Sequence, residues 1–212
     1  AADGTTFNGA VKATQVTVSE GTVAKFTNAD VQIGNVAVST GAKLAFTAAD
    51  VQGETTPTVT TLSVAANAQL ELSTKLTAST LTIEDGGYLV FGNGSKLTVT
   101  GTLTLDASAI TFADDISFSS ADAVTLATAG TLNVTGVDSW KGEYTIGDKA
   151  YTAGLSAVNN VLSLTFEEVV TPENPSITTT LPTSVTDVLG YEKGMLTLQV
   201  EGLLTENTMA VV

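Results

Sequence analysis

The sequence contains no cysteine, no histidine and no arginine, and all eight of its basic residues are lysines. Without cysteine there are no disulfides, thiolate nucleophiles or cysteine-ligated zinc and iron–sulfur sites. Without histidine the chain lacks the usual general base near neutral pH and the commonest metal ligand. Without arginine it lacks the bidentate clamp for phosphate and carboxylate groups. These absences predict that the chain is not an enzyme; the alternative is that a β protein of simple composition has lost rare residue types by drift.

Positive charge is also scarce, because 22 aspartates and glutamates face eight lysines and the formal net charge is −14. Nucleic-acid phosphates need cationic side chains to neutralise them, so we expect no nucleic-acid partner. Anionic lipid surfaces are disfavoured for the same reason, and no apolar run approaches membrane-spanning length, so we expect no membrane insertion. The start at Ala1-Ala2-Asp3 fits a mature product cut after a small-residue cleavage site, or a boundary within a longer chain.

Hydrophobic residues are nevertheless 43% of the chain, while aromatic residues are only 6%. The apolar residues are mainly valine, leucine, alanine and isoleucine, and threonine is abundant. Because β-branched side chains pack well on pleated surfaces, this composition predicts an all-β domain with a sizeable core.

A motif of about twenty residues repeats along the first half of the chain. Each copy reads apolar-x-apolar, then a short polar turn, then a second apolar-x-apolar, and residues 53–57 lengthen one copy. This period of two predicts short strands that each bury one face. Gly21, Gly41, Asn67 and Gly86 occupy the same turn position. Since glycine and asparagine tolerate positive φ, we expect a left-handed backbone there.

Two arrangements satisfy this pattern: a meander or sandwich of β-hairpins, and a solenoid whose coils pair in parallel. The phasing of the repeat favours the solenoid, because each coil must match its neighbours to bury a continuous core. The equivalent residues then form three ladders: Val16/Val36/Leu62/Leu81/Leu103, Val18/Val38/Val64/Ile83/Leu105 and Phe26/Phe46/Leu72/Phe91/Phe112. We therefore predict a parallel β-solenoid, specifically a right-handed β-helix of about five or six coils, with capping strands, over residues 1–167.

Residues 168–212 are expected to form a linker followed by a short β-rich C-terminal extension, or the start of a truncated second domain. Three glutamates and two prolines crowd residues 167–175, which is typical of a linker. Leu196, Leu198 and Val200 then alternate with polar residues, as in an amphipathic strand. This strand could cap the solenoid, begin the second domain or pair with a neighbouring subunit.

The copy at residues 81–91, Leu-Thr-Ile-Glu-Asp-Gly-Gly-Tyr-Leu-Val-Phe, resembles the autotransporter-associated β-strand repeats. Residues 124–130 with Thr135 and Gly136 resemble the segment that often closes such arrays, and residues 161–166 resemble its final strand. The resemblance covers roughly residues 10–167 and implies a right-handed β-helix, export and a scaffold role. In composition the chain also resembles bacterial and archaeal surface-layer proteins, which are acidic, free of cysteine and richer in lysine than arginine.

Few residues qualify as site candidates. The adjacent carboxylates are Asp114-Asp115, Glu84-Asp85 and Glu167-Glu168. Neighbours on a strand point to opposite faces, so these pairs are interpreted as turn solvation rather than a catalytic dyad. Trp140 and Tyr144 are either a sugar-stacking platform or a plug at the end of the core. We assign no catalytic, cofactor-binding or metal-binding residue.

Calcium is the best metal candidate, since it takes oxygen ligands alone, and Asp106, Asp114, Asp115 and Asp122 fall in successive turns. No calcium-loop motif accompanies them, so no ligands and no cofactor are assigned. The N-glycosylation sequons Asn93-Gly94-Ser95 and Asn133-Val134-Thr135 are expected by chance in so threonine-rich a chain.

The sequence thus predicts a secreted, non-catalytic structural protein of the bacterial cell surface: a surface layer, filament or adhesin stalk. Its expected partners are further copies of itself, in a homo-oligomer or polymer formed through the solenoid ends or the C-terminal strand. The alternative is a carbohydrate-binding module or a β-helical polysaccharide-active enzyme, with a glycan as ligand.

Overall fold

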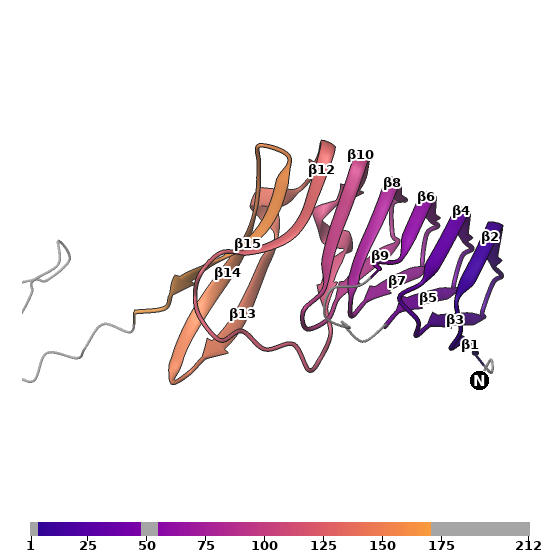
Figure 1. Ribbon diagram of the computed structural model, residues 1–212. Coiled ribbons are helices and arrows are strands. Elements are labelled where there is room, and N and C mark those ends of the chain that lie inside the picture. Colours follow the sequence, from indigo (N-terminus) through magenta and orange to yellow (C-terminus); the bar gives the residue numbers. More distant parts are fainter. Residues whose placement is uncertain (1–3, 48–54, 171–212) are drawn as a thin grey trace, which may run out of the picture. The chain divides into compact units, whose positions relative to one another are not determined.

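The computed structural model of the chain (Figure 1) describes residues 4–47 and 55–170, and it is all-β. The described residues up to Val169 belong to one compact unit. The strands are β1 (Thr5–Phe7), β2 (Val11–Val18), β3 (Val23–Phe26), β4 (Val31–Val38), β5 (Lys43–Phe46), β6 (Thr58–Val64), β7 (Gln69–Leu72), β8 (Lys75–Ile83), β9 (Tyr88–Phe91), β10 (Lys96–Asp106), β11 (Ile110–Phe112), β12 (Val124–Thr135), β13 (Lys141–Ile146), β14 (Lys149–Val158) and β15 (Val161–Glu168). Two 3₁₀ turns, η1 (Ala107–Ala109) and η2 (Val137–Ser139), interrupt them.

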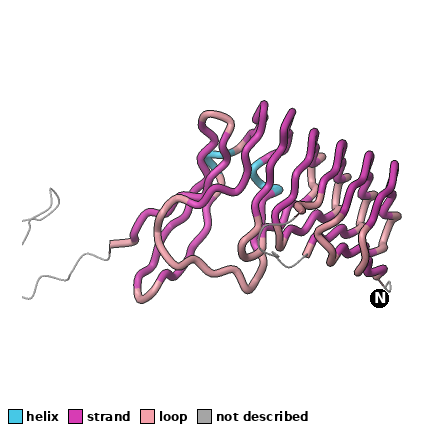
Figure 2. The backbone as a smooth tube through the Cα atoms, in the orientation of Figure 1, coloured by secondary structure: helices cyan, strands magenta, loops and turns pink. Residues whose placement is uncertain are grey.

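The strands of successive repeats are sorted into two sheets. Sheet A has the order β1-β3-β5-β7-β9-β11, and sheet B has the order β13-β14-β15-β12-β10-β8-β6-β4-β2. From β1 to β12 the chain visits the two sheets alternately, and every pairing among these strands is parallel. Figure 2 shows the resulting stack of similar layers. The apolar faces of the strands meet between the sheets, where they form the hydrophobic core.

The in-register ladders expected from the repeat are present. Val16, Val36, Leu62, Leu81 and Leu103 pair in sequence, and so do Phe26, Phe46, Leu72, Phe91 and Phe112. The third ladder runs from Val18 to Ile83. Its last member, Leu105, pairs with Val134 of β12. Phe7 extends the aromatic ladder by one residue, because it pairs with Phe26 and stacks on its ring at a centroid distance of 4.8 Å.

The long strands of sheet B begin earlier than the repeat pattern indicates. A further ladder precedes the expected ones and comprises Ala13, Ile33, Val59, Ala78, Val99 and Ala129. Glycine allows close approach of the strands beside it: a Cβ at Gly34 would lie 2.4 Å from the carbonyl oxygen of Thr14, and one at Gly130 would lie 2.4 Å from that of Thr100. The sequence analysis did not predict this ladder, because the alanine, glycine and threonine around it give only a weak apolar alternation.

The turn prediction is confirmed. Gly21, Gly41 and Gly86 have φ angles of 68°, 69° and 76°, and Asn67 has a φ angle of 58°. Glycine has no Cβ to be strained in this left-handed region, and asparagine tolerates the region because its short polar side chain can form local hydrogen bonds. The fifth copy differs, because the 3₁₀ turn η1 follows Asp106 instead.

After β12 the pairing changes direction. β12 pairs in parallel with β10 on one side and antiparallel with β15 on the other, and β15, β14 and β13 form an antiparallel meander. The hairpin arrangement that the sequence left open is thus found at this end of sheet B, while the repeats themselves pair in parallel. The expected extension at 168–212 lies almost wholly outside the described residues, so it stays a prediction.

Candidate functional site

The two ends of the strand stack differ, because the end formed by β1 and β2 stops on a layer of the repeat itself, whereas further strands and an aromatic cluster follow the last repeat layer at the other end. Among the described residues, β1 pairs with β3 alone and β2 with β4 alone. Phe7, Val11 and Val16 are only half-buried there. One layer further in, Val31 and Val36 occupy the positions of Val11 and Val16 and are 1% and 2% exposed. These positions of the core therefore become fully buried only when a further layer of strands packs against them.

The opposite end is closed by a cluster of aromatic side chains. Phe112, the last member of the aromatic ladder, makes edge contacts with Phe118, Trp140 and Tyr144 at centroid distances of 5.8–6.2 Å. Phe166 joins the cluster through Phe118 and Tyr144. The indole Nε1 of Trp140 donates a hydrogen bond of 3.0 Å to the carbonyl oxygen of Ile110. These contacts use Trp140 and Tyr144 as a plug over the core, and burial raises the pKa of Tyr144 above 10.0.

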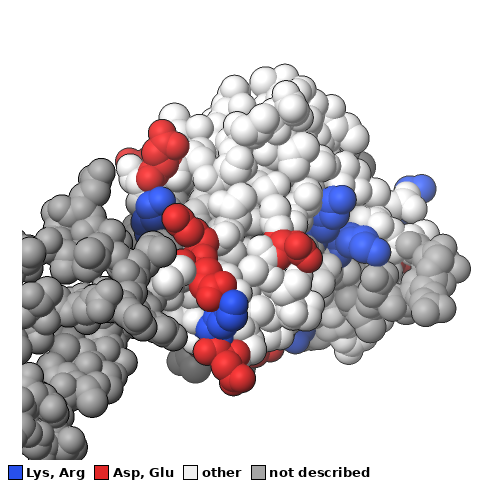
Figure 3. Space-filling view, turned by 90° about the vertical axis from the view of Figure 1, so that its left-hand side faces the viewer, with Lys and Arg blue, Asp and Glu red and all other residues white. Residues whose placement is uncertain are grey.

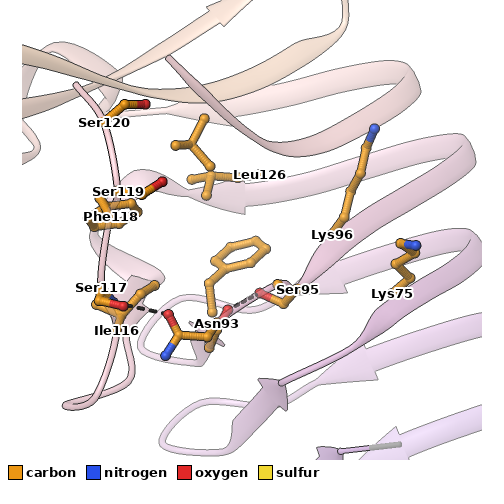
Figure 4. A pocket seen from close by; sticks show the side chains of 14 residues that line it. Lys75, Asn93, Ser95, Lys96, Ile116, Ser117, Phe118, Ser119, Ser120 and Leu126 are labelled. Carbon is orange, nitrogen blue, oxygen red and sulfur yellow. Dashed lines mark hydrogen bonds between the residues drawn. The ribbon is translucent and has the colours of Figure 1, made fainter. Parts of the chain in front are cut away.

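A pocket of about 380 Å³ opens beside this cluster, between the β9–β10 turn and the long connection from β11 to β12 (Figure 4). Its apolar lining includes Phe91, Phe118 and Leu126, and its polar lining includes Lys96 and Ser117. The complete lining is Lys75, Phe91, Gly92, Asn93, Gly94, Ser95, Lys96, Ile116, Ser117, Phe118, Ser119, Ser120, Val124 and Leu126. Sequence reasoning missed this pocket. Its one signal was a pair of lysines at equivalent positions of two successive repeats, Lys75 and Lys96.

Asn93 fixes the wall of the pocket. Its side-chain Nδ2 donates to the carbonyl oxygen of Asp115 at 2.8 Å, and its Oδ1 accepts from the backbone N–H of Ser117 at 3.0 Å. A glycan on this sequon would replace a hydrogen of the Nδ2 atom that holds the loop. In the other sequon, Asn133 is exposed on β12 and the Thr135 hydroxyl donates to the Asp106 carboxylate at 2.6 Å.

The structure does not gather the candidate carboxylates into a site. Asp114, Asp115 and Asp122 are exposed, and so are the pairs Glu84-Asp85 and Glu167-Glu168. Residues 4–47 and 55–170 contain no group of three or more Asp, Glu, His or Cys residues that could hold a metal ion. The carboxylate of Glu168 forms an ion pair with Lys149 at 2.9 Å instead, which raises the pKa of the lysine.

Asp106 has a structural role at the start of η1. Its carboxylate accepts hydrogen bonds from the hydroxyl of Ser108 at 2.6 Å, from the hydroxyl of Thr135 at 2.6 Å and from the backbone N–H of Ser108 at 2.9 Å. The carboxylate thereby links β10 to β12, the strand beside it. Because all three bonds favour the charged form, they lower the pKa of Asp106 from 3.8 to about 2.

Stability is expected to fall between about pH 4 and pH 2 because of Asp106. A carboxyl whose folded-state pKa lies below its unfolded value contributes stability above the unfolded pKa, and this contribution is lost as the pH falls through the folded pKa. Urea unfolding midpoints at pH 5 and pH 2.5 should therefore differ less for Asp106→Asn than for the parent chain. Asp138→Asn, at an exposed aspartate of η2, is the control. An equal pH dependence in parent and Asp106→Asn would contradict this role.

Charge is distributed unevenly along the described chain. Residues 4–47 carry three lysines against two acidic residues, whereas residues 101–170 carry nine acidic residues against two lysines. Figure 3 views the molecule from the side of β13–β15 and shows an extended area of its upper part without charged side chains. By the residue counts, the layers nearest β1 and β2 are the least acidic part of the described chain.

The described part of the chain has no helix long and apolar enough to cross a membrane. Comparisons of the chain with protein-family models, with curated proteins and with solved structures find no match.

Proposed function

We propose that this chain is a secreted, non-catalytic structural protein of the cell surface that acts by self-association, as a part of a surface layer, filament or adhesin stalk. The observation that carries the proposal is the difference between the two ends of the stack. One end stops at β1 and β2 on a half-buried layer of the repeat itself, while at the other end, where β11 and β13 are the edge strands, an aromatic cluster is added over the last layer.

A right-handed β-solenoid is the architecture that we propose for the repeats. It is supported by the alternate visits of the chain to two parallel sheets and by ladders of equivalent residues in register. In such a stack each layer contacts only its neighbours, so the last layer exposes the surface that a further layer would cover. A second copy presenting a matching strand would provide that layer.

Self-association at β1 and β2 has a favourable electrostatic setting. A net charge of −14 makes copies of the chain repel each other. This repulsion is weakest where the acidic residues are fewest, in the layers of residues 4–47. Unpaired strand edges supply backbone hydrogen-bond donors and acceptors, and the half-buried side chains of Phe7, Val11 and Val16 supply apolar area.

Two parts of the proposal, the location at the cell surface and the lack of catalytic activity, are supported by the composition of the chain. The chain has no histidine, cysteine or arginine. The described carboxylates form no cluster of three or more, and they are exposed except for Asp106, which is held by hydrogen bonds, and Glu71, which is half-buried and pairs with Lys43. Such a chain fits a scaffold better than a catalyst.

The test is to measure the molar mass of the purified chain in solution and to image the chain by electron microscopy. We expect concentration-dependent assemblies for the parent chain and a folded monomer for Val16→Lys, because a charged side chain in the open layer prevents its burial. Thr17→Lys is the matched control, since Thr17 is exposed on the other face of the same strand. A parent chain that remains monomeric at high concentration would overturn the proposal, and so would assemblies that survive Val16→Lys.

A further inference from the structure

We propose that two copies of the chain associate end to end about a two-fold axis, with the β2 edge of one copy in antiparallel pairing with the β2 edge of the other. This inference rests on the proposed self-association and names its partner surface, since the β1/β2 end binds the same end of a second copy. A two-fold contact uses one surface on both partners, so it closes at a dimer.

The core-facing side chains of β2 follow a pattern that reads the same in both directions. These residues are Val11, Ala13, Val16 and Val18, with exposed residues between them. The midpoint of the pattern lies between Thr14 and Gln15, so reversal of the strand exchanges Val11 with Val18. An antiparallel β2 strand of a second copy therefore places all its apolar side chains over the half-buried layer. A register shifted by one residue would turn polar side chains to the core instead.

The free backbone groups of β2 fit the same register. The N–H of Val11 and the C=O of Val18 form hydrogen bonds of 2.9 Å with residues that flank β4. Neighbouring residues of a strand direct their polar groups to the opposite side, which leaves those of Lys12 and Thr17 at the open edge. In the reversed register Lys12 lies opposite Thr17 of the second copy. These two residues can then exchange both of their backbone hydrogen bonds.

The charges of the end layer favour pairing with itself. Residues 4–30 carry two lysines and two acidic residues, so two such layers meet without net repulsion. Lys12 lies near the start of β2, and Glu20 follows the end of the strand; both are exposed. Antiparallel pairing brings the Lys12 end of each copy next to the Glu20 end of the other, whereas parallel pairing would set like charges side by side.

The opposite end of the stack does not offer a matching surface. Sheet A ends there at β11, while sheet B continues from β10 through β12, β15 and β14 to β13. The edge strand β13 is thus four strands beyond β10, a distance of about 19 Å. The aromatic cluster around Phe112 packs against the end of sheet A. Because β1 and β2 are consecutive strands, a second β1/β2 end matches both edges, and the stepped end does not.

The experiment is oxidative cross-linking of the double variant Lys12→Cys/Thr17→Cys, which adds two thiols to a chain without cysteine. In a hydrogen-bonded antiparallel pair the two Cα atoms lie about 5.5 Å apart, which suits a disulfide. We expect the oxidised double variant to run as a covalent dimer on a denaturing gel. Lys12→Cys alone and Thr17→Cys alone are the matched controls. Their cysteines would lie about 17 Å from the same residue of the second copy, so both should run as monomers.

The parent chain gives a second readout without any substitution. Its molar mass should level off at two chains as the concentration rises, because a two-fold contact cannot propagate. Thr17→Lys should still dimerise, but about fivefold more weakly, since the new lysine lies opposite Lys12 of the second copy. Steady growth to longer assemblies that Val16→Lys abolishes would indicate a head-to-tail contact and would overturn the two-fold arrangement.

The cross-linking result separates this inference from the proposed function. If the reduced double variant assembles as the parent does but yields no covalent dimer on oxidation, the two-fold contact is wrong and self-association stands. Equal cross-linking of the single and double variants would also contradict the contact, because it would indicate random collision. A parent chain that stays monomeric at high concentration refutes both. Addition of Val16→Lys to the double variant should abolish the cross-link, since the apolar layer can no longer close.

Discussion

Replacement of Phe46 by alanine is expected to lower the free energy of unfolding by about 4 kcal/mol, because it empties the middle of the aromatic ladder. Phe46 is 0% exposed, and its ring stacks on that of Phe26 at a centroid distance of 5.3 Å. On its other side it pairs with Leu72. The strands above and below are fixed by hydrogen bonds, so they cannot collapse into the space that the ring leaves. Urea denaturation followed by circular dichroism measures the change.

Phe46→Leu is the control for this prediction. Leucine already stands at the same ladder position in the next layer, at Leu72, so we expect a loss of only about 1 kcal/mol, because leucine refills most of the volume of the phenylalanine side chain. If Phe46→Ala cost no more than Phe46→Leu, the ladder would not be a main source of stability.

Replacement of Gly34 by alanine is expected to be the second most damaging change, with a loss of about 3 kcal/mol. The new Cβ would lie 2.4 Å from the carbonyl oxygen of Thr14, on the adjacent strand β2. A backbone oxygen in a parallel ladder cannot move aside as a flexible side chain can. The strands β2 and β4 would have to separate near this point, which would weaken the pairing on which the β1/β2 end depends.

Gly9→Ala tests whether crowding, rather than loss of a glycine, causes the effect. No atom lies within 4 Å of a Cβ built at Gly9, so the free energy of unfolding should change by no more than about 0.5 kcal/mol. Thermal or urea unfolding of both variants settles the comparison. Similar losses at Gly34 and Gly9 would show that the close approach at Thr14 has no special cost.

The residues of the pocket beside the β9–β10 turn illustrate why the sequence does not reveal every cavity. Phe91 and Leu126 come from strands of different sheets, and Phe118 comes from a connection with no regular structure. No spacing in the chain brings these residues together. The aspartates considered as calcium ligands show that regular spacing does not guarantee a site. They fall in successive turns of the sequence, yet the described residues form no cluster of metal ligands.

The sequence by itself determined the repeating part of the fold. A period of about twenty residues, with apolar residues two apart and glycine or asparagine in one turn position, specifies which residues pair and where φ becomes positive; Val16 opposite Val36 and Gly21 at φ 68° are examples. Each of these constraints is local or recurs from copy to copy, so it can be read along the chain. The tertiary structure decided the rest: the reversal to antiparallel pairing at β15, the aromatic closure around Phe112, and the open layer at Val16. These features depend on which strand or side chain lies next to the last layer at each end of the stack. Beyond the last copy the repeat pattern stops, so the sequence no longer indicates that neighbour.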